Sequence, residues 1–573
     1  GHFQISLYFL TAVLMYIIYK FIIDRNIRKV SYTVIFTFLG VLLTMPQVLP
    51  SMELYLESFR SSFFQKGGIP IEYIPTLLAP DFFGNPVTRN TWFGHYAEWN
   101  AYIGVLPLML AFYSFVSIKK PQVLFLFFFG IIAFSLGINS PISDFVLNLH
   151  LPVFSTSSLN RIIILYSFAF AVLAGFGYDR LLLDIKNANK KRIIFWVCFF
   201  IFIFIILWSM VVFKLFIPID KISITKQNLI LPTILFLASG AIVVCGAIFR
   251  KLPHVKVIQA LIASGLITVV AFDMLRFAGK WQAFDPKNLV FPDFPTANAL
   301  SKISGFNRVF GNLGGEATIY YKLPSVEGYD ALYSKRYGEF IGYIEKEEII
   351  ESAWSVVSFP KHSKNTQKAI NFLNIKYIVH KIADNGVSWT FPIWIYPQKQ
   401  FSLFYKDGLY EFYQNNNVLP HAFLVGEYQV IKDKRKILET IFSDAFDVGK
   451  EIVLEENPKI SKAKDVIGDA KIINYKQNSI DISVDAKSNA LLFLTDNYYG
   501  GWKATVDGRR VPILRANYTF RAVPVRKGKH AVKFFYEPWS FSLGIYLAAG
   551  GLVGIVLLTL ISKSKGRLKS ISS

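Results

Sequence analysis

The sequence predicts a polytopic α-helical membrane protein with a C-terminal extracytoplasmic α/β region and an antiparallel β-sandwich, closed by a final transmembrane helix. Of the 573 residues, 53% are hydrophobic and 16% are aromatic, which exceeds the share in soluble domains. The excess is concentrated in apolar runs of about twenty residues, the length that crosses a bilayer. A long polar segment separates the last two runs, and its final part alternates polar and apolar residues as β-strands do.

Nine apolar runs are the candidate membrane spans, each long enough to cross the hydrocarbon core as a helix. They lie at residues 5–23, 31–50, 101–118, 121–137, 161–178, 193–213, 229–249, 256–272 and 541–561. The first eight form a predicted transmembrane domain, 1–272, and the ninth forms 541–573 together with a basic tail. Because the chain begins Gly-His and enters a span at once, we expect it to be truncated at its N-terminus.

The charges of the connecting loops predict the orientation of the spans. One set of alternate loops, with the C-terminal tail, holds 17 Lys and Arg residues, and the longer opposite set holds only six. Since cytoplasmic loops are enriched in Lys and Arg, the first set is predicted to be cytoplasmic, and the loop 51–100 and the segment 273–540 to face outward. Orientation thus explains much of the net charge of +22, and no nucleic-acid partner is expected.

The outward segment is long enough for two domains. Its first part, 273–456, mixes helix and strand patterns and is predicted to be an α/β domain. Its second part, 457–540, has short alternating strands and a hairpin signal, Asp507-Gly508, which predict a β-sandwich. The expected strands are 479–485, 490–495, 503–507, 520–525 and 530–536. Lys and Arg residues on them predict either a basic sheet face that attracts anionic lipid or polymer, or an ordinary solvated face.

The loop 51–100 carries the residues with the strongest chemical signal. It holds the carboxylates Glu53, Asp81 and Glu98 and the imidazole of His95 between two apolar runs. Carboxylates next to a bilayer are costly unless they are solvated, paired or functional. This loop is therefore either the wall of an active site or an ordered connection whose charges face water.

Arg161 opens the apolar run 161–178 at the same predicted surface. Its guanidinium can bond two phosphate oxygens at once, which suits the phosphate of a lipid carrier. The alternative is that the side chain only extends to the headgroups of ordinary lipids. The signatures of common soluble enzymes are missing from the sequence, which contains no Walker loop, HExxH, GxSxG or CxxC.

Several segments resemble the YfhO family of bacterial membrane proteins. They are Gly1-His2-Phe3-Gln4, residues 98–104 (EWNAYIG), 323–330 (LPSVEGYD), 494–508 (LTDNYYGGWKATVDG) and 511–525 (VPILRANYTFRAVPV). The family usually has Pro where this chain has Phe3, a difference that concerns a local turn. The resemblance runs through nearly the whole chain.

Members of this family look like glycosyltransferases of the C superfamily, which take a sugar from a polyprenyl-phosphate carrier at the outer face of the bacterial cell membrane. The resemblance implies an inverting enzyme whose partners are this donor, a surface glycan such as lipoteichoic acid as acceptor, and membrane lipid. It also places the principal catalytic acid in an outer loop upstream of residue 1. The cofactor stays open, with a divalent cation, Mg²⁺ or Mn²⁺, as the candidate.

The chemistry of such a transfer selects the candidate residues. A carboxylate takes the proton of the acceptor hydroxyl, and cations stabilise the leaving phosphate. The candidate catalytic residues are Glu53, Asp81, Glu98, His2 and His95. The three acids shape the site or bind a metal ion, and the two imidazoles assist. The candidate substrate-binding residues, of which all but Arg161 come from the resembling segments, are Gln4, Arg161, Tyr329 and Asp330.

Two other functions compete with the enzyme. A non-catalytic transporter of a lipid-linked glycan would carry charges inside its spans, and the predicted spans are apolar through their centres. A surface-polymer assembly protein would present its outer domain to a polymer and would need no acids in the loops.

Overall fold

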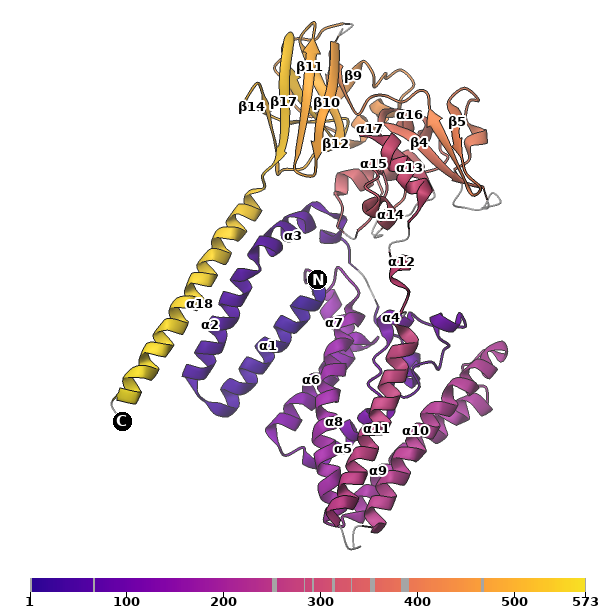
Figure 1. Ribbon diagram of the computed structural model, residues 1–573, viewed down its shortest axis with the longest axis vertical. Coiled ribbons are helices and arrows are strands. Elements are labelled where there is room, and N and C mark those ends of the chain that lie inside the picture. The colour runs from indigo at the N-terminus through magenta and orange to yellow at the C-terminus, as the bar shows by residue number, and fades with distance from the viewer. Residues whose placement is uncertain are drawn as a thin grey trace. The chain divides into compact units, whose positions relative to one another are not determined.

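The computed structural model describes residues 3–64, 67–249, 255–282, 284–290, 293–311, 315–330, 332–350, 356–382, 391–464 and 468–571. By its internal contacts the chain divides into two compact units. The first comprises 1–34 and 64–286, and the second comprises 35–63 and 287–573. Figure 1 labels many of the elements of both units.

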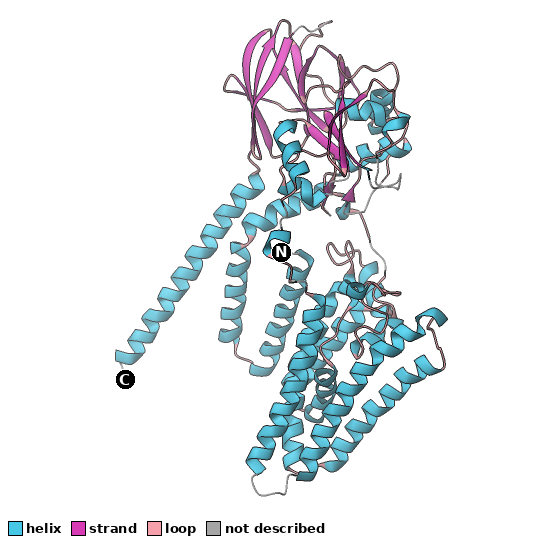
Figure 2. Ribbon diagram, turned by 45° about the vertical axis from the view of Figure 1, so that its right-hand side comes forward, coloured by secondary structure: helices cyan, strands magenta, loops and turns pink. Residues whose placement is uncertain are grey.

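The first unit is built from helices, drawn in cyan in Figure 2. They are α1 (Phe3–Asp24), α4 (Tyr96–Trp99), α5 (Val105–Tyr113), α6 (Pro121–Gly137), α7 (Pro141–Asn148), α8 (Ile163–Lys186), α9 (Lys190–Val212), α10 (Ile222–Phe249) and α11 (Val255–Trp281), with the start of α2 (Ile27–Leu43). In the described parts of the whole chain, six helices are long and apolar enough to cross a membrane. They are Gln4–Asp24, Leu159–Lys186, Lys190–Val212, Ile219–Ile248, Gln259–Trp281 and Trp539–Ile561, which confirms six of the nine predicted runs.

The other three predicted runs form helices of a different kind. The run 31–50 is a pair, α2 and α3 (Met45–Glu57), bent by 66°. Pro46 lies at the start of α3, and because it has no N–H it cannot continue the hydrogen bonding of α2. The runs 101–118 and 121–137 form Val105–Ser117 and Pro121–Gly137. At 1.5 Å per residue these helices are only about 20 and 25 Å long, below the 30 Å of hydrocarbon.

The core of the first unit centres on α8. Its buried side chains include Ala169, Phe170 and Leu173, which repeat at helical spacing and pack between α5 and α6. At Gly177 the helix comes so close to α5 that an added Cβ would lie 1.8 Å from the carbonyl oxygen of Leu110. This packing positions the N-terminal end of α8, where Arg161 lies.

Helix α11 is longer than the sequence predicted. The expected span ended at residue 272, but the helix runs to Trp281 and includes Asp273, Arg276 and Lys280. Apolar residues continue between these charges, and Asp273 is buried against hydrogen-bond donors, so the charges do not end the helix. The helix therefore extends nine residues past the predicted end of the span at residue 272.

The second unit contains a small mixed sheet and a β-sandwich, both drawn in magenta in Figure 2. The mixed sheet has the order β1 (Arg308–Gly311), β4 (Ile375–Lys381), β6 (Tyr410–Asn415), β5 (Phe401–Lys406), and a separate pair joins β2 (Gly328–Tyr329) to β3 (Val356–Val357). The helices of this unit are the later part of α2, α3, α12 (Lys287–Val290), α13 (Pro295–Ser304), α14 (Gly315–Tyr320), α15 (Lys335–Lys346), α16 (Thr366–Phe372), α17 (Lys434–Phe442) and α18 (Trp539–Ile571). These elements confirm the predicted α/β region and the final apolar helix.

The sandwich confirms the predicted alternating strands and extends them. One sheet has the order β10 (Gly468–Lys476), β11 (Ser479–Ala486), β17 (Gly528–Tyr536), β13 (Trp502–Val506), β14 (Arg509–Val511). The other has the order β7 (Ala422–Val425), β12 (Ala490–Asn497), β16 (Phe520–Val525), β15 (Leu514–Ala516), β9 (Glu451–Leu454), β8 (Glu427–Val430). Strand β12 is buried on both faces, with Leu492 in the sandwich core and Phe493 against the helices. Three strands of this sheet, β7, β8 and β9, come from before residue 457. Strand β12 pairs with β7 on one side and with β16 on the other, β15 pairs with β9 and β16, and β9 pairs with β8.

The outer face of the five-stranded sheet carries charges of both signs. Lys533 lies opposite Asp481, and Lys529 lies opposite Asp485 on the neighbouring strand. Cross-strand pairs of opposite charge offset each other. These pairs of opposite charge favour the second of the two predicted alternatives, an ordinary solvated face.

Candidate functional site

The loop that joins α3 to α5 is folded, and much of it is buried in the first unit. Tyr73 stacks on Phe83 with ring centroids 5.2 Å apart, and Phe83 contacts Trp92 at 5.0 Å. Gly84 has a φ of +85°, and an added Cβ there would lie 2.1 Å from the carbonyl oxygen of Asn90. Only glycine combines this conformation with so close an approach. Aromatic packing therefore gives the loop a defined conformation beneath its charged residues.

Asp81 is buried and saturated with hydrogen bonds. Its Oδ1 accepts from the hydroxyl of Tyr96 at 2.6 Å and from Nδ2 of Asn85 at 2.7 Å. Its Oδ2 accepts from Nζ of Lys280 at 2.6 Å, and Nδ2 of Asn228 donates to its backbone oxygen at 2.6 Å. The residue thus ties the loop to both α10 and α11.

The charge of Asp81 follows from this environment. Burial alone would raise the pKa of its carboxyl group, but the hydrogen bonds from Lys280, Tyr96 and Asn85 outweigh burial and hold that pKa below its usual value. Burial and the adjacent carboxylate raise the pKa of Tyr96. Asp81 is therefore an ionised anchor and a weak proton acceptor.

Glu98, Arg161 and Gln4 form a second cluster in the same unit. Nη2 of Arg161 bonds Oε1 of Glu98 at 2.6 Å, and Nη1 lies 3.3 Å from Oε1 of Gln4. Nε2 of Gln4 donates to the hydroxyl of Tyr8 at 2.7 Å and to the backbone oxygen of Ser158 at 2.9 Å. Three segments far apart in the sequence thus meet at one guanidinium, and all three side chains were predicted as site residues.

The place of this cluster suits an anionic ligand. Arg161 lies in the short helix Leu159–Ile162 that leads directly into α8, so the positive end of a long helix lies beside the guanidinium. The side chains of Arg161 and Glu98 are 28% and 42% exposed, whereas that of Asp81 is only 9% exposed. A ligand can therefore reach the Glu98–Arg161 pair but not the carboxylate of Asp81.

The short helix α4 connects the two clusters. Tyr96 reaches Asp81 from this turn, and Glu98, two residues on, reaches Arg161. His95 precedes the turn, is exposed, and lies edge-on to Trp99 at a centroid distance of 5.2 Å. It is thus in the same loop as the clusters, while the other predicted imidazole, His2, lies outside the described residues.

The remaining predicted residues, Glu53, Tyr329 and Asp330, belong to the second unit. Glu53 lies on α3, where it hydrogen-bonds Tyr499. Tyr329 is 59% exposed on β2, and Asp330 accepts a hydrogen bond from the backbone of Leu332 at 2.8 Å. The structure therefore groups Gln4, Glu98 and Arg161 within the first unit.

Sequence reasoning missed the polar face of α11. Oδ2 of Asp273 accepts from the hydroxyl of Tyr102 at 2.7 Å and from the backbone nitrogen of Val105 at 3.0 Å. A cavity of about 40 Å³, lined by Asp81, Asp273 and Arg276 among others, lies beside it. The spacing of Asp273, Arg276 and Lys280, three and four residues apart, was the available signal because it places them on one helix face.

The sequence leaves the divalent cation open as a cofactor, and in the part of the chain that the structure describes no group of three or more His, Cys, Asp and Glu residues could hold an ion. Asp81 is occupied by protein donors, and Glu98 by a guanidinium. These acids therefore do not fit a metal centre, and no catalytic step is derived through one.

A known family model matches the C-terminal part of the second unit. Residues 450–548 match the model of the bacterial membrane protein YfhO family. The YfhO match runs from β9 through the sandwich into the first turns of α18. Neither the search of curated proteins nor that of solved structures found a match.

Proposed function

We propose that the chain is a membrane glycosyltransferase of the C-superfamily type, which moves a sugar from a polyprenyl-phosphate carrier to a cell-surface glycan or teichoic-acid-like polymer at the outer face of the bacterial cell membrane. The observation that carries the proposal is the accessible cluster of Glu98, Arg161 and Gln4 at the start of a membrane-length helix. A lipid-linked donor has its phosphate at headgroup level and its tail in hydrocarbon, so an arginine at a helix end is suitably placed to bind it.

In this mechanism the phosphate of the donor competes with Glu98 for Arg161. A phosphate offers the guanidinium the same two-oxygen contact as a carboxylate, but with more charge. Gln4 holds Arg161 from the other side, so the guanidinium stays in place as Glu98 is released. The freed carboxylate then accepts a proton from the acceptor hydroxyl. Asp81 takes no part in the chemistry and fixes the loop that carries Glu98.

The transfer itself is a single displacement. The acceptor oxygen attacks the anomeric carbon while the bond from that carbon to the phosphate oxygen breaks, which inverts the configuration. The phosphate leaves with the bonding electrons, and Arg161 stabilises its charge. In this proposal Glu98 assists the transfer as a base.

An in vitro transfer assay on the full-length protein, with a panel of polyprenyl-phosphate sugars, tests the proposal. We expect Arg161→Gln and Glu98→Gln each to lower the rate by about 100-fold, the range of a lost charge-stabilising or proton-transfer group. Arg161→Lys should fall in between, because it keeps the charge but loses the planar fork. Arg89→Gln, an exposed arginine of the same loop, is the matched control. Full activity of the Arg161 and Glu98 variants at normal protein levels would refute the assignment.

One observation favours a second function, a non-catalytic transporter of a lipid-linked glycan. Asp273 is buried within the candidate span Gln259–Trp281, and buried carboxylates in spans often mark a transport route. Under this alternative Asp273→Asn abolishes the movement of a fluorescent lipid-linked sugar across proteoliposomes. The glycosyltransferase proposal predicts a different result, provided that Asp273→Asn folds. Adding Arg161→Gln to this variant then lowers the rate of sugar transfer by the same factor as adding Arg161→Gln to the original protein.

A further inference from the structure

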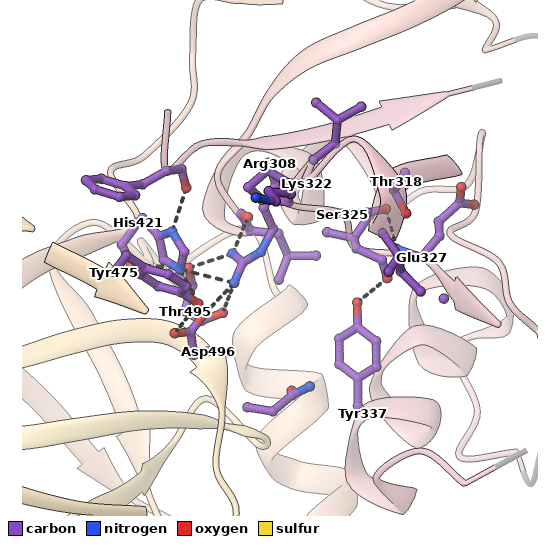
Figure 3. A pocket seen from close by; sticks show the side chains of 18 of the residues that line it. Arg308, Thr318, Lys322, Ser325, Glu327, Tyr337, His421, Tyr475, Thr495 and Asp496 are labelled. Atoms are coloured by element: carbon purple, nitrogen blue, oxygen red, sulfur yellow. Dashed lines mark hydrogen bonds and ion pairs between the residues drawn. The ribbon is translucent and has the colours of Figure 1, made fainter. Parts of the chain in front are cut away.

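The second unit contains a large polar cavity that the proposed glycosyltransferase chemistry does not use. Its volume is about 1070 Å³, at the upper end of the range for ligand pockets. Its lining comes from the start of β1, from residues 318–328, and from the ends of β10 and β12. Figure 3 shows these side chains converging on the cavity from two sides.

One side is a fixed cluster of charges around Asp496. Its Oδ1 accepts from Nη2 of Arg308 at 2.8 Å and lies 2.8 Å from Nε2 of His421, and its Oδ2 accepts from the hydroxyl of Tyr475 at 2.9 Å. Arg521, almost fully buried, places Nη2 3.5 Å from the same carboxylate. Burial would raise the pKa of Asp496, but His421 and the two arginines outweigh it and keep the carboxyl group ionised. Two guanidinium groups thus face one carboxylate, which leaves an excess of positive charge.

The other side carries Ser325, Glu327 and Tyr337 (Figure 3), and Lys322 also lines the cavity. Among the residues that the structure describes, none bonds or pairs with the ammonium group of Lys322, and the same holds for Lys476 on the rim. Glu327 Oε1 accepts from the backbone nitrogen of Phe359 at 2.9 Å, and burial raises the pKa of its carboxyl group. The available cations therefore outnumber the anions around the cavity.

The remaining lining is of the kind that binds hydroxyl groups. Ser325, Gln477 and Asn497 offer hydroxyl and amide groups, and the rings of Phe306 and Tyr475 lie together with centroids 5.9 Å apart. Aromatic faces pack against the apolar faces of sugar rings, while polar groups around them bond the hydroxyls.

We propose that this cavity binds an anionic sugar unit, a pyranose-sized ring that carries a phosphate. The ring lies against Tyr475 and Phe306, and the phosphate meets the ammonium groups of Lys322 and Lys476. The site does not depend on the glycosyltransferase proposal, because a transporter or an assembly protein would use it equally well.

Calorimetric titration of the purified full chain in detergent micelles tests this site with three probes: glucose 6-phosphate, glucose and inorganic phosphate. We expect glucose 6-phosphate to bind at least tenfold more tightly than either of the other two. Lys322→Gln and Lys476→Gln should each weaken its binding about five- to tenfold, the effect of one charge-assisted contact. Both lysines are exposed and unbonded, so these variants should fold. Lys399→Gln, an exposed lysine outside the lining, should bind as the parent does.

The outcomes separate this inference from the proposed function. If glucose binds as tightly as glucose 6-phosphate, the claim that the cavity selects an anion is refuted. If inorganic phosphate binds as tightly as glucose 6-phosphate, the claim that the cavity binds a sugar ring is refuted. Binding that Lys322→Gln and Lys476→Gln leave unchanged places the ligand elsewhere and refutes the site. None of these results depends on sugar transfer, which Arg161→Gln tests separately.

Discussion

Two carboxylates of one loop have opposite surroundings, and this difference assigns their roles. Asp81 is enclosed by Lys280, Tyr96 and Asn85, whereas Glu98 is 42% exposed and bonds to Arg161. A buried, saturated carboxylate cannot take a proton or a ligand without losing bonds that stabilise the fold. An exposed carboxylate such as Glu98, whose partner Arg161 is also open to solvent, can take a proton or a ligand. The structure therefore separates an anchor from a candidate reactive group, although both were predicted as catalytic.

The anchor role predicts a loss of stability when the charge of Asp81 is removed. We expect Asp81→Asn to lower the free energy of unfolding by about 2–3 kcal/mol, because it leaves Lys280 partly buried without its counter-ion. This is below the upper range for buried pairs, since Lys280 is 26% exposed. Chemical unfolding in detergent measures it. The double variant Asp81→Asn with Lys280→Met should regain part of the loss, and Asp220→Asn, at an exposed pair, should lose almost nothing. If Asp81→Asn left the free energy of unfolding unchanged, Asp81 would not be an anchor of the fold.

The same carboxylate predicts a dependence on pH. Its pKa in the folded protein lies below its usual value of 3.8, so its contribution to stability is complete above about pH 5 and is lost as the pH falls through the folded pKa. The difference in unfolding temperature between the parent and Asp81→Asn should therefore be largest near pH 6 and shrink below pH 4. A difference that stays constant down to pH 3 would show that the charge of Asp81 does not stabilise the fold.

At the scale of elements, the contact between α5 and α8 sets the position of Arg161. We expect Gly177→Ala to destabilise the protein by about 1–3 kcal/mol, because its new Cβ would lie 1.8 Å from the carbonyl oxygen of Leu110 and push the helices apart. Gly175→Ala is a control two residues away, where a Cβ meets nothing within 4 Å. It should be neutral or slightly stabilising, since alanine favours helix. Thermal unfolding in detergent compares the two, and equal effects would contradict the close approach.

Most elements could be predicted from the sequence because each follows from a local pattern. The long apolar runs became helices, and the alternating strands of the sandwich appeared close to their expected bounds. The misses depend on distant residues. Helix α11 continues past residue 272 because Tyr102 and Val105 donate to Asp273. Strands β7, β8 and β9 join the sandwich through pairing that no local pattern specifies.

At the scale of the whole molecule, the types of the site residues were predictable but their grouping was not. Acids, an arginine and a glutamine next to apolar runs could be selected one by one. Only the packing of helices decides that Gln4 and Glu98 meet at Arg161, while Glu53, in the same predicted loop, belongs with the second unit. Loop charge carries information at a longer range, because it reports on which side of the membrane each loop lies.

Orientation therefore gives the last prediction, which the proposed chemistry at the outer face requires. In a background with Cys198 and Cys245 replaced by Ala, we expect Val87→Cys and Lys399→Cys to react with a membrane-impermeant maleimide in intact cells. Asn187→Cys, in a loop rich in Lys and Arg, should react only after the cells are opened. All three side chains are exposed, so failure to react reports the membrane barrier rather than burial. Labelling of Val87→Cys and Lys399→Cys only in opened cells would reverse the orientation, and an outer-face transferase would then be impossible.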